Sequence, residues 1–304
     1  MIAHIAIALS LTLAAPTARA ELPLPGTTVK YDERAGDPVR LSAFGLGNTS
    51  AYVRARAGDA FARQQGMSEA AVSPGGATVA AVPKSYRSGY DSVLLTDRAG
   101  GQTRRVRTVR KPLTASYVSW SRDGTRLALT VEQKVGGRWQ AVGFTVVDVA
   151  AATARTVRVS GLSRGAGFWW TPDGNLVATY GTGLRLYRVA DGMVLRTFAG
   201  VGLPTGPEDS FSPSGKRMAM WCPPRFTEQL CVADTGTGKI VQRVAVRPEA
   251  LFGWWDDSHV IAVMAHQGAY RLAVLDLNGK VTRVLAAIPA RTWAQELWLS
   301  FTRT

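Results

Sequence analysis

The stretch SPSGKRMAM, Ser212 to Met220, is one of five related copies of a nine-residue phrase that together decide the fold. The other copies are SPGGATVAA (73–81), SRDGTRLAL (121–129), TPDGNLVAT (171–179) and WDDSHVIAV (255–263). The intervals between the fourth residues, Gly76, Gly124, Gly174, Gly215 and Ser258, are 48, 50, 41 and 43 residues. A repeat of this length is typical of stacked four-stranded units.

Each phrase begins with turn chemistry and continues as a strand. Proline presets φ, aspartate caps its own backbone, and glycine accepts the positive φ that closes a tight hairpin. Four residues after the turn position every copy has alanine, namely Ala80, Ala128, Ala178, Ala219 and Ala262. A larger apolar residue precedes each alanine, which predicts a strand covered on both faces. We expect the alanine where neighbouring sheets approach closely.

The second half of each period repeats less strictly. Stretches such as LRLYRVADG (184–192) and LCVADTGTG (230–238) combine an apolar strand with a turn, and a more polar strand follows. An apolar stretch such as GFWW (167–170) precedes the phrase. The period therefore holds four short strands, which predicts the blade of a β-propeller.

These residues resemble the WD-repeat-like propeller repeats of TolB-type proteins, whose blades carry a similar S-P-D-G-x-x-[LIV]-A phrase. The resemblance covers roughly residues 70–290. Two copies depart from it, because Gly75 replaces the aspartate and the copy beginning at Trp255 has neither the proline nor the glycine. The resemblance implies a fold and no particular activity, since propellers serve as binding modules, hydrolases and lyases.

The period also predicts the number of blades. A mean of about 45.5 residues divides the roughly 284 residues after a leader into six blades, within the usual range of about four to eight. Seven is the alternative, because further strands could lie between Phe44 and Gly66, a stretch that could also form a short helix or a long surface loop. Residues 29–41 look like the second half of a blade and residues 292–302 like the first half. We predict an all-β chain whose single propeller, residues 21–304, closes by pairing N- and C-terminal strands.

The N-terminus indicates export. Residues 2–15 are almost wholly apolar, and Ala18-Arg19-Ala20 offers a small-x-small cleavage site, so we predict a signal peptide over residues 1–20. An uncleaved anchor is the alternative, although the apolar core is shorter than the roughly 20 residues of a membrane span. We expect a secreted, periplasmic or envelope-associated monomer without an integral membrane span after removal of the signal.

The chain has two cysteines, Cys222 and Cys231, on either side of the connection between two expected strands. Antiparallel partners bring β-carbons within disulfide reach, and an oxidising compartment favours the bond. We therefore predict a disulfide, with two buried free thiols as the alternative.

The formal net charge is +14, and basic residues concentrate in residues 98–111. Cations on an outermost strand discourage edge pairing, which explains them without a ligand. They could also form a patch for an anionic envelope polymer, anionic lipid headgroups or an acidic protein. The residues of this basic patch are Arg98, Arg104, Arg105, Arg107, Arg110 and Lys111. Nucleic acid is disfavoured as a partner by the leader.

Candidate catalytic groups are few. The stretch GLSRG (161–165) matches G-x-S-x-G, but an apolar strand follows where the nucleophile elbow needs a helix. His259 and His266 lie seven residues apart, which places them on opposite faces of a strand and argues against a shared metal site. One of them could act as a general base with Asp256 or Asp257. We assign no catalytic, cofactor-binding or metal-ligating residue.

Tryptophans recur beside the repeated phrase. Trp120 and Trp170 directly precede two copies, Trp169 adjoins the second, and Trp254 and Trp255 lie at the start of another. Recurrence at one register indicates packing between blades before it indicates binding. Within each Trp-Trp pair the second ring could be partly exposed, where it would favour peptide or sugar contacts.

The sequence is compatible with two functions. The first is a non-catalytic interaction module that binds a protein or an anionic envelope polymer at its loops or channel mouth, without a cofactor. The alternative is a propeller enzyme, a hydrolase or lyase acting on a sugar, lactone or peptide, whose acids would come from different blades. An acidic cluster lining the channel, with a convergent histidine or bound calcium, would favour the enzyme, and a channel lined with small apolar residues would count against it.

Overall fold

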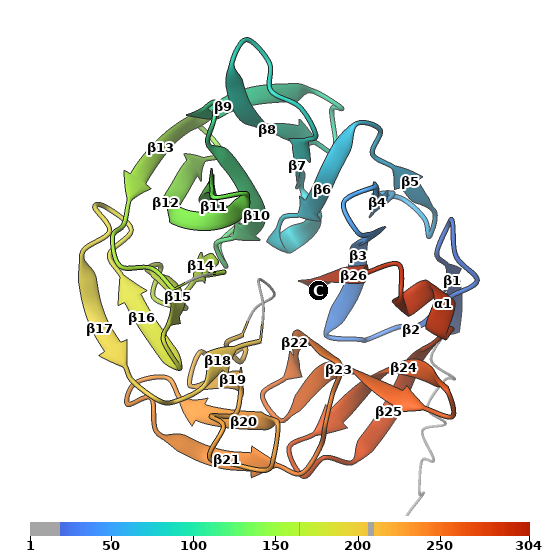
Figure 1. The fold of residues 1–304 in the computed structure, drawn as a ribbon. Coiled ribbons are helices and arrows are strands. Elements are labelled where there is room, and N and C mark those ends of the chain that lie inside the picture. The colour runs from blue at the N-terminus through green and yellow to red at the C-terminus, as the bar shows by residue number, and fades with distance from the viewer. Residues whose placement is uncertain (1–18, 164, 206–209) are drawn as a thin grey trace, which may run out of the picture.

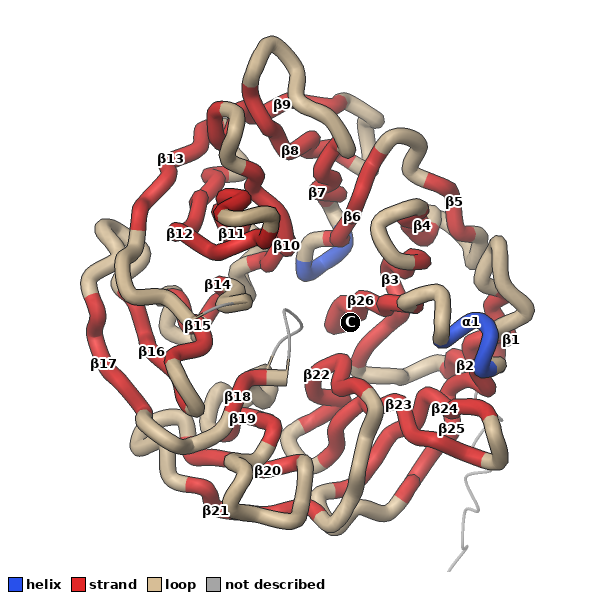
Figure 2. Tube along the Cα trace, in the orientation of Figure 1, coloured by secondary structure: helices blue, strands red, loops and turns tan. Residues whose placement is uncertain are grey.

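The computed structural model describes residues 19–163, 165–205 and 210–304, which form six four-stranded sheets arranged in a ring (Figure 1). Among these residues, helix is limited to a 3₁₀ turn, η1 (Pro74–Gly76), and α1 (Ala290–Trp293) (Figure 2). The predicted all-β propeller of six blades is therefore confirmed. The predicted leader, residues 1–20, lies outside the described residues except for its last two, and its cleavage stays a prediction.

Five blades are built from consecutive strands, each numbered from the channel outwards. Blade 1 contains β6 (Met67–Val72), β7 (Thr78–Pro83), β8 (Tyr90–Asp97) and β9 (Thr103–Arg110). Blade 2 contains β10 (Thr114–Trp120), β11 (Arg126–Val135), β12 (Arg138–Asp148) and β13 (Thr153–Arg158). Blade 3 contains β14 (Phe168–Trp170), β15 (Leu176–Tyr180), β16 (Gly183–Tyr187) and β17 (Val194–Phe198).

The last two of these five blades follow the same order. Blade 4 contains β18 (Leu203–Pro204), β19 (Arg217–Trp221), β20 (Leu230–Asp234) and β21 (Ile240–Val244). Blade 5 contains β22 (Ala250–Asp256), β23 (His259–His266), β24 (Ala269–Asp276) and β25 (Val281–Ile288).

The sixth blade, the seam blade, joins the two ends of the chain. Its strands are β26 (Leu297–Arg303), β3 (Val39–Leu46), β4 (Ser50–Arg54) and β5 (Phe61–Arg63). Ring closure by terminal strands is thus confirmed. The blade combines one C-terminal strand with three N-terminal strands, whereas the sequence predicted that each end would contribute half of the blade. Much of the stretch 44–66 supplies strands of this blade, and the described residues form no seventh blade.

The difference at the seam arises from the first two strands. β1 (Arg19–Pro23) and β2 (Lys30–Arg34) pair only with each other, in a hairpin beside the seam blade and β25 (Figure 1). Their apolar side chains, Tyr31 among them, are buried in the same cluster as residues of blade 5 and the seam blade. Arg283 of β25 binds the hairpin end through Asp37 Oδ1 at 2.5 Å and Asp32 O at 2.9 Å. The sequence placed residues 29–41 in the blade because strand pattern alone does not identify the partner.

The core is divided into six apolar clusters, one between each pair of neighbouring blades. The repeated alanines belong to these interfaces: Ala128 of blade 2 lies in one cluster with Phe168 of blade 3, and Ala219 of blade 4 with Leu251 of blade 5. All five repeated alanines are at most 1% exposed. This confirms the expected crowded position between sheets.

The turns of the repeated phrase meet one another at one end of the ring. Gly215 has φ +73°, and a β-carbon there would lie 2.9 Å from Pro172 Cβ in the turn of the preceding blade. Gly124 has φ +69°, and a β-carbon would lie 3.4 Å from Pro74 O. The positive φ favours glycine at both turns, and at Gly215 the neighbouring proline leaves no room for a β-carbon as well.

Candidate functional site

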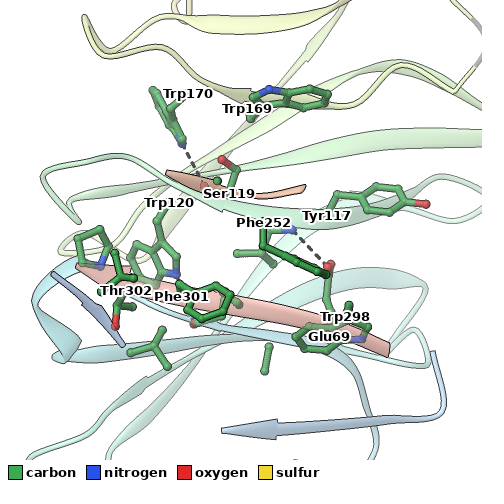
Figure 3. A pocket seen from close by; sticks show the side chains of 18 of the residues that line it. Glu69, Tyr117, Ser119, Trp120, Trp169, Trp170, Phe252, Trp298, Phe301 and Thr302 are labelled. Carbon is green, nitrogen blue, oxygen red and sulfur yellow. Dashed lines mark hydrogen bonds between the residues drawn. The ribbon is translucent and has the colours of Figure 1, made fainter. Parts of the chain in front are cut away.

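The inner strands enclose a central cavity of about 660 Å³. Strands β6, β10, β14, β22 and β26 each contribute residues to its wall (Figure 3). Aromatic side chains make up much of this wall: Tyr117, Trp120, Trp169, Trp170, Phe252, Trp254, Trp298 and Phe301. A wall of this kind, apolar with a few polar groups, is typical of ligand-binding cavities.

Most of the cavity tryptophans also hold neighbouring strands together. Three indole N–H groups donate to backbone carbonyls of the preceding blade: Trp120 Nε1 to Ala71 O (3.3 Å), Trp170 Nε1 to Ser119 O (3.0 Å) and Trp254 Nε1 to Ser210 O (2.9 Å). Trp169 is an exception. Its side chain is buried, and its Nε1 has no hydrogen-bond partner among the described residues. Packing between blades therefore explains the recurring rings, while Trp169 offers an unpaired donor.

A bulge in β10 builds the polar part of the wall. The pairing of β10 with β11 shifts register between Ser116 and Ser119, and Tyr117 there has a φ of +60° and is 50% exposed. The N–H of Val118 donates to Oε2 of Glu69, a residue of β6, with an N–O distance of 3.3 Å (Figure 3). The other oxygen, Glu69 Oε1, is buried without a hydrogen-bond partner in the described part of the chain. Bulges and positive φ at non-glycine residues are features that often accompany binding sites.

Burial perturbs the carboxyl groups near this bulge. It raises the pKa of Glu69 to about 7, because desolvation outweighs the hydrogen bonds from the backbone, and the Asp91 and Glu132 carboxylates add to the rise. Burial also raises the pKa values of Asp91 and Glu132 themselves. Asp91 Oδ2 accepts the Ala115 N–H at 2.8 Å, at the start of β10. The protein is strongly basic, yet several of its carboxyl groups gather at this end of the inner strands.

The opposite end of the cavity is basic. Arg122 follows β10 and donates from Nη2 to Ser212 O at 2.8 Å, and Arg303 at the end of β26 donates from Nη2 to Trp254 O at 3.1 Å. Both guanidinium groups thus bind the backbone of other blades. The cavity has a carboxyl end and an arginine end.

The candidates that the sequence suggested for catalysis lie elsewhere. His259 Nδ1 is 2.9 Å from Asp256 Oδ1, and both residues line a second cavity of about 360 Å³ beside the β1–β2 hairpin. Neither His259 nor His266 lines the central cavity. Ser163 Oγ accepts the Gly181 N–H at 2.7 Å, and β14 follows it instead of a helix. Within residues 19–163, 165–205 and 210–304, no three His, Cys, Asp or Glu side chains are grouped to hold a metal ion.

The predicted disulfide is present. Cys222, directly after β19, bonds to Cys231 in β20 with an S–S distance of 2.11 Å and a Cα–Cα distance of 4.9 Å. The bond lies in blade 4 and closes the connection between its second and third strands.

The basic patch of residues 98–111 is partly structural. Arg104, on the outermost strand β9, donates to Val149 O at 2.5 Å and Ala150 O at 2.8 Å in the next blade. Arg155 makes the same kind of contact to Val189 O (2.8 Å) one blade further, and Arg196 to Gly236 O after that. An arginine on the outer strand that holds the next blade's turn is therefore a repeated element of the ring.

Other patch residues also have partners within the protein. Arg98 donates to Gly76 O at 2.9 Å and to Arg54 O at 2.6 Å, and Arg105 donates to Ser92 Oγ at 2.6 Å. The Arg107 guanidinium lies 5.3 Å from the centre of the Tyr90 ring. Arg110 and Lys111, at the end of β9, are exposed. The structure thus places most of the patch on one strand and gives several of its cations a structural role.

The sequence reading did not identify Glu69 or Tyr117. The only signal for Glu69 was its place directly before the apolar residues 70–72 that lead into the first phrase. No sequence pattern marked Tyr117, because the bulge that exposes it is a property of strand pairing.

Comparisons with known proteins agree on the fold. No protein-family model matches the sequence, and no curated protein matches it. Among solved structures, TolB from Acinetobacter baumannii is similar with a TM-score of 0.52 and 18% identity, over 88% of this chain and 66% of that chain. An oligogalacturonate lyase in complex with manganese has a TM-score of 0.57 and 12% identity, over 88% and 84%. A chain of the mitotic checkpoint complex has a TM-score of 0.55 and 14% identity, over 97% and 99%.

At these identities the similarity concerns the fold alone. The chain spans just under two thirds of the TolB chain, and the similar structures include a lyase and a component of a protein complex. The propeller therefore leaves both binding and catalysis open. Within the part that the structure describes, no helix is long and apolar enough to cross a membrane.

Proposed function

We propose that this chain is an exported, non-catalytic interaction module that binds a segment of a partner protein at the carboxyl end of its central cavity. One observation carries the proposal: a cavity of about 660 Å³ with an aromatic wall contains buried polar atoms that nothing in the described protein satisfies. Large aromatic side chains dominate the energetics of protein recognition, and buried unpaired groups favour a ligand that completes them.

Export is supported by two independent features. The Cys222–Cys231 disulfide is of the kind that persists in oxidising compartments, and the apolar residues 2–15 have the character of a secretory leader. A secretion space or cell envelope is the compartment that accommodates both.

Site-specific photo-cross-linking tests the binding proposal. A photoreactive amino acid at Tyr117, exposed at the cavity, should give a saturable adduct in the exporting cell, while the same group at Trp139, 47% exposed on a blade 2 hairpin, should not. The captured protein is then purified, and its affinity for Tyr117→Ala should fall about tenfold relative to Trp139→Ala. Equal labelling from both positions, or an affinity insensitive to Tyr117→Ala, would contradict the proposal.

An anionic envelope polymer is the second partner class that we propose, and it would bind the outer face of blade 1. Its support is the exposed end of the basic patch, Arg107, Arg110 and Lys111. Binding to heparin as a model polyanion should weaken steeply with added salt and fall further in the double variant Arg110→Gln/Lys111→Gln. A response independent of salt would leave the patch as edge protection and interblade contact only.

The alternative function, a propeller enzyme, is favoured by one observation. Glu69 has a pKa of about 7, which suits a general acid or base near neutral pH. If the chain is a hydrolase or lyase, turnover of a sugar, lactone or peptide substrate should be lost in Glu69→Gln and kept in Glu296→Gln, which changes an exposed carboxyl of the same cavity.

A further inference from the structure

We propose that the central cavity recognises an organic cation, the ammonium or guanidinium group of its ligand, by pairing it with Glu69. The inference rests on the proposed binding function and specifies the chemistry of the ligand. Its starting point is Glu69, which lines the cavity and whose Oε1 is buried and accepts no hydrogen bond from the described residues. The second oxygen, Oε2, already accepts the Val118 N–H.

A carboxylate oxygen in this position favours a cationic partner. Buried acceptors without a partner destabilise a protein, and charged ones do so most. No ion pair reaches Glu69 from residues 19–163, 165–205 or 210–304. The arginines of the cavity wall, Arg122 and Arg303, bind backbone carbonyls at the other end. A charge-assisted hydrogen bond from a ligand would satisfy Oε1.

The surroundings of Glu69 suit a cation as well. Tyr117, Phe252 and Trp298 line the same cavity, and the faces of such rings attract ammonium and guanidinium groups (Figure 3). Asp91 and Glu132 lie close enough to raise the pKa of Glu69 through their charge. An anionic ligand would meet repulsion from all of these carboxylates at this end.

The unpaired indole N–H of Trp169 indicates which kind of molecule carries the cation. Trp169 is 7% exposed, lines the same cavity, and its Nε1–H has no acceptor among the described residues. A lysine or arginine within a peptide brings a cation for Glu69 together with backbone carbonyls for this donor. A free alkylamine would satisfy Glu69 alone, so the structure favours a basic residue of a peptide.

Two matched peptides test this inference on the full chain. Acetyl-Ala-Ala-Lys-Ala-Ala-amide and its norleucine counterpart differ by the ammonium group, and calorimetry at pH 8 and low salt measures their affinities. The wild type should bind the lysine peptide at least about tenfold more tightly than the norleucine peptide. Glu69→Gln should abolish this preference, and Glu249→Gln, which changes an exposed carboxyl outside the cavity lining, should keep it. n-Butylammonium serves as the free-amine arm and should bind more weakly than the lysine peptide.

The outcomes separate the inference from the function beneath it. A wild type that binds the lysine peptide no more tightly than the norleucine peptide, or a Glu69→Gln variant that keeps the preference, overturns cation recognition. Cross-linking from Tyr117 that still captures a partner would then leave the binding function standing. n-Butylammonium that binds as tightly as the lysine peptide would overturn the assignment to a peptide.

Discussion

Glu69 should make the stability of this protein depend on pH in an unusual direction. Its pKa rises from 4.5 to about 7 on folding, mainly because burial penalises the carboxylate. One pKa unit corresponds to about 1.4 kcal/mol, so the charged form of Glu69 costs about 3 kcal/mol of folding free energy. Glu69→Gln replaces the group by a neutral one of the same shape and should remove this cost.

The sign follows from proton binding. Below pH 4.5, Glu69 is protonated in both states and the penalty is absent. Between pH 4.5 and about 7 the unfolded chain releases this proton while the folded chain keeps it, so the wild type loses stability as pH rises. The loss becomes complete and constant about one pH unit above 7. The stability of Glu69→Gln relative to wild type should therefore rise by about 2.5 kcal/mol between pH 5 and pH 8, since part of the loss has already occurred at pH 5.

Urea unfolding followed by tryptophan fluorescence at pH 5, 6, 7 and 8 measures this difference. Glu296→Gln is the matched control, because Glu296 lines the same cavity but is exposed, and its difference from wild type should stay nearly flat. Asp91 and Glu132 titrate in every variant, so their effect largely cancels in the comparison. A Glu69→Gln difference that does not change between pH 5 and pH 8 would refute the reasoning and the burial of this charge.

Three further changes test how the ring is held together. Cys222→Ala/Cys231→Ala opens a loop with a sequence separation of 9 and should lower the free energy of unfolding by about 2 to 3 kcal/mol, measured in urea. Arg283→Met removes the cation that pairs with the buried carboxylate of Asp37, while Asp32 keeps its pair with Arg19, and should cost about 3 kcal/mol in the same assay. Gly215→Ala should lower the free energy of unfolding by about 1 to 3 kcal/mol more than Gly101→Ala, and with it the melting temperature, since both have positive φ but only Gly215 has a close neighbour.

Each change has an internal comparison. Wild type under reducing conditions should match the cysteine variant, and unequal stability would show an effect of the substitution itself. Arg188→Met breaks a solvent-exposed pair with Asp191 and should destabilise the protein far less than Arg283→Met; an equal loss of stability would remove the special role of the seam. Equal melting temperatures for the two glycine variants would refute the close approach of neighbouring turns.

The ring was predictable because its requirements recur. Each blade needs a turn that fits against its neighbour's turn and a small residue where sheets approach, so Gly215 and Ala219 have counterparts along the chain. Repetition converts a weak local pattern into a strong one. The same logic explains Trp170 and Arg104, whose contacts join neighbouring blades.

The seam was predictable only in part. Strand β2 alternates buried and more exposed positions, and β3 begins in the same way, but such a pattern does not state which partner a strand takes. The partner is decided by contacts distant in sequence, above all the bonds from Arg283 to Asp32 and Asp37. The need to close the ring predicted that N- and C-terminal strands pair. It did not predict that one C-terminal strand would join three N-terminal strands.

The site escaped prediction for the opposite reason to the ring. Residues that build the ring are constrained to repeat, whereas inner-strand positions facing the channel are free to differ. Four residues before two copies of the phrase stand Glu69 and Tyr117, a carboxyl and a ring at one register. Specificity in such a fold has to come from positions like these, because six equivalent blades present no distinct surface. The departures from the repeat are therefore the residues through which a ligand would be recognised.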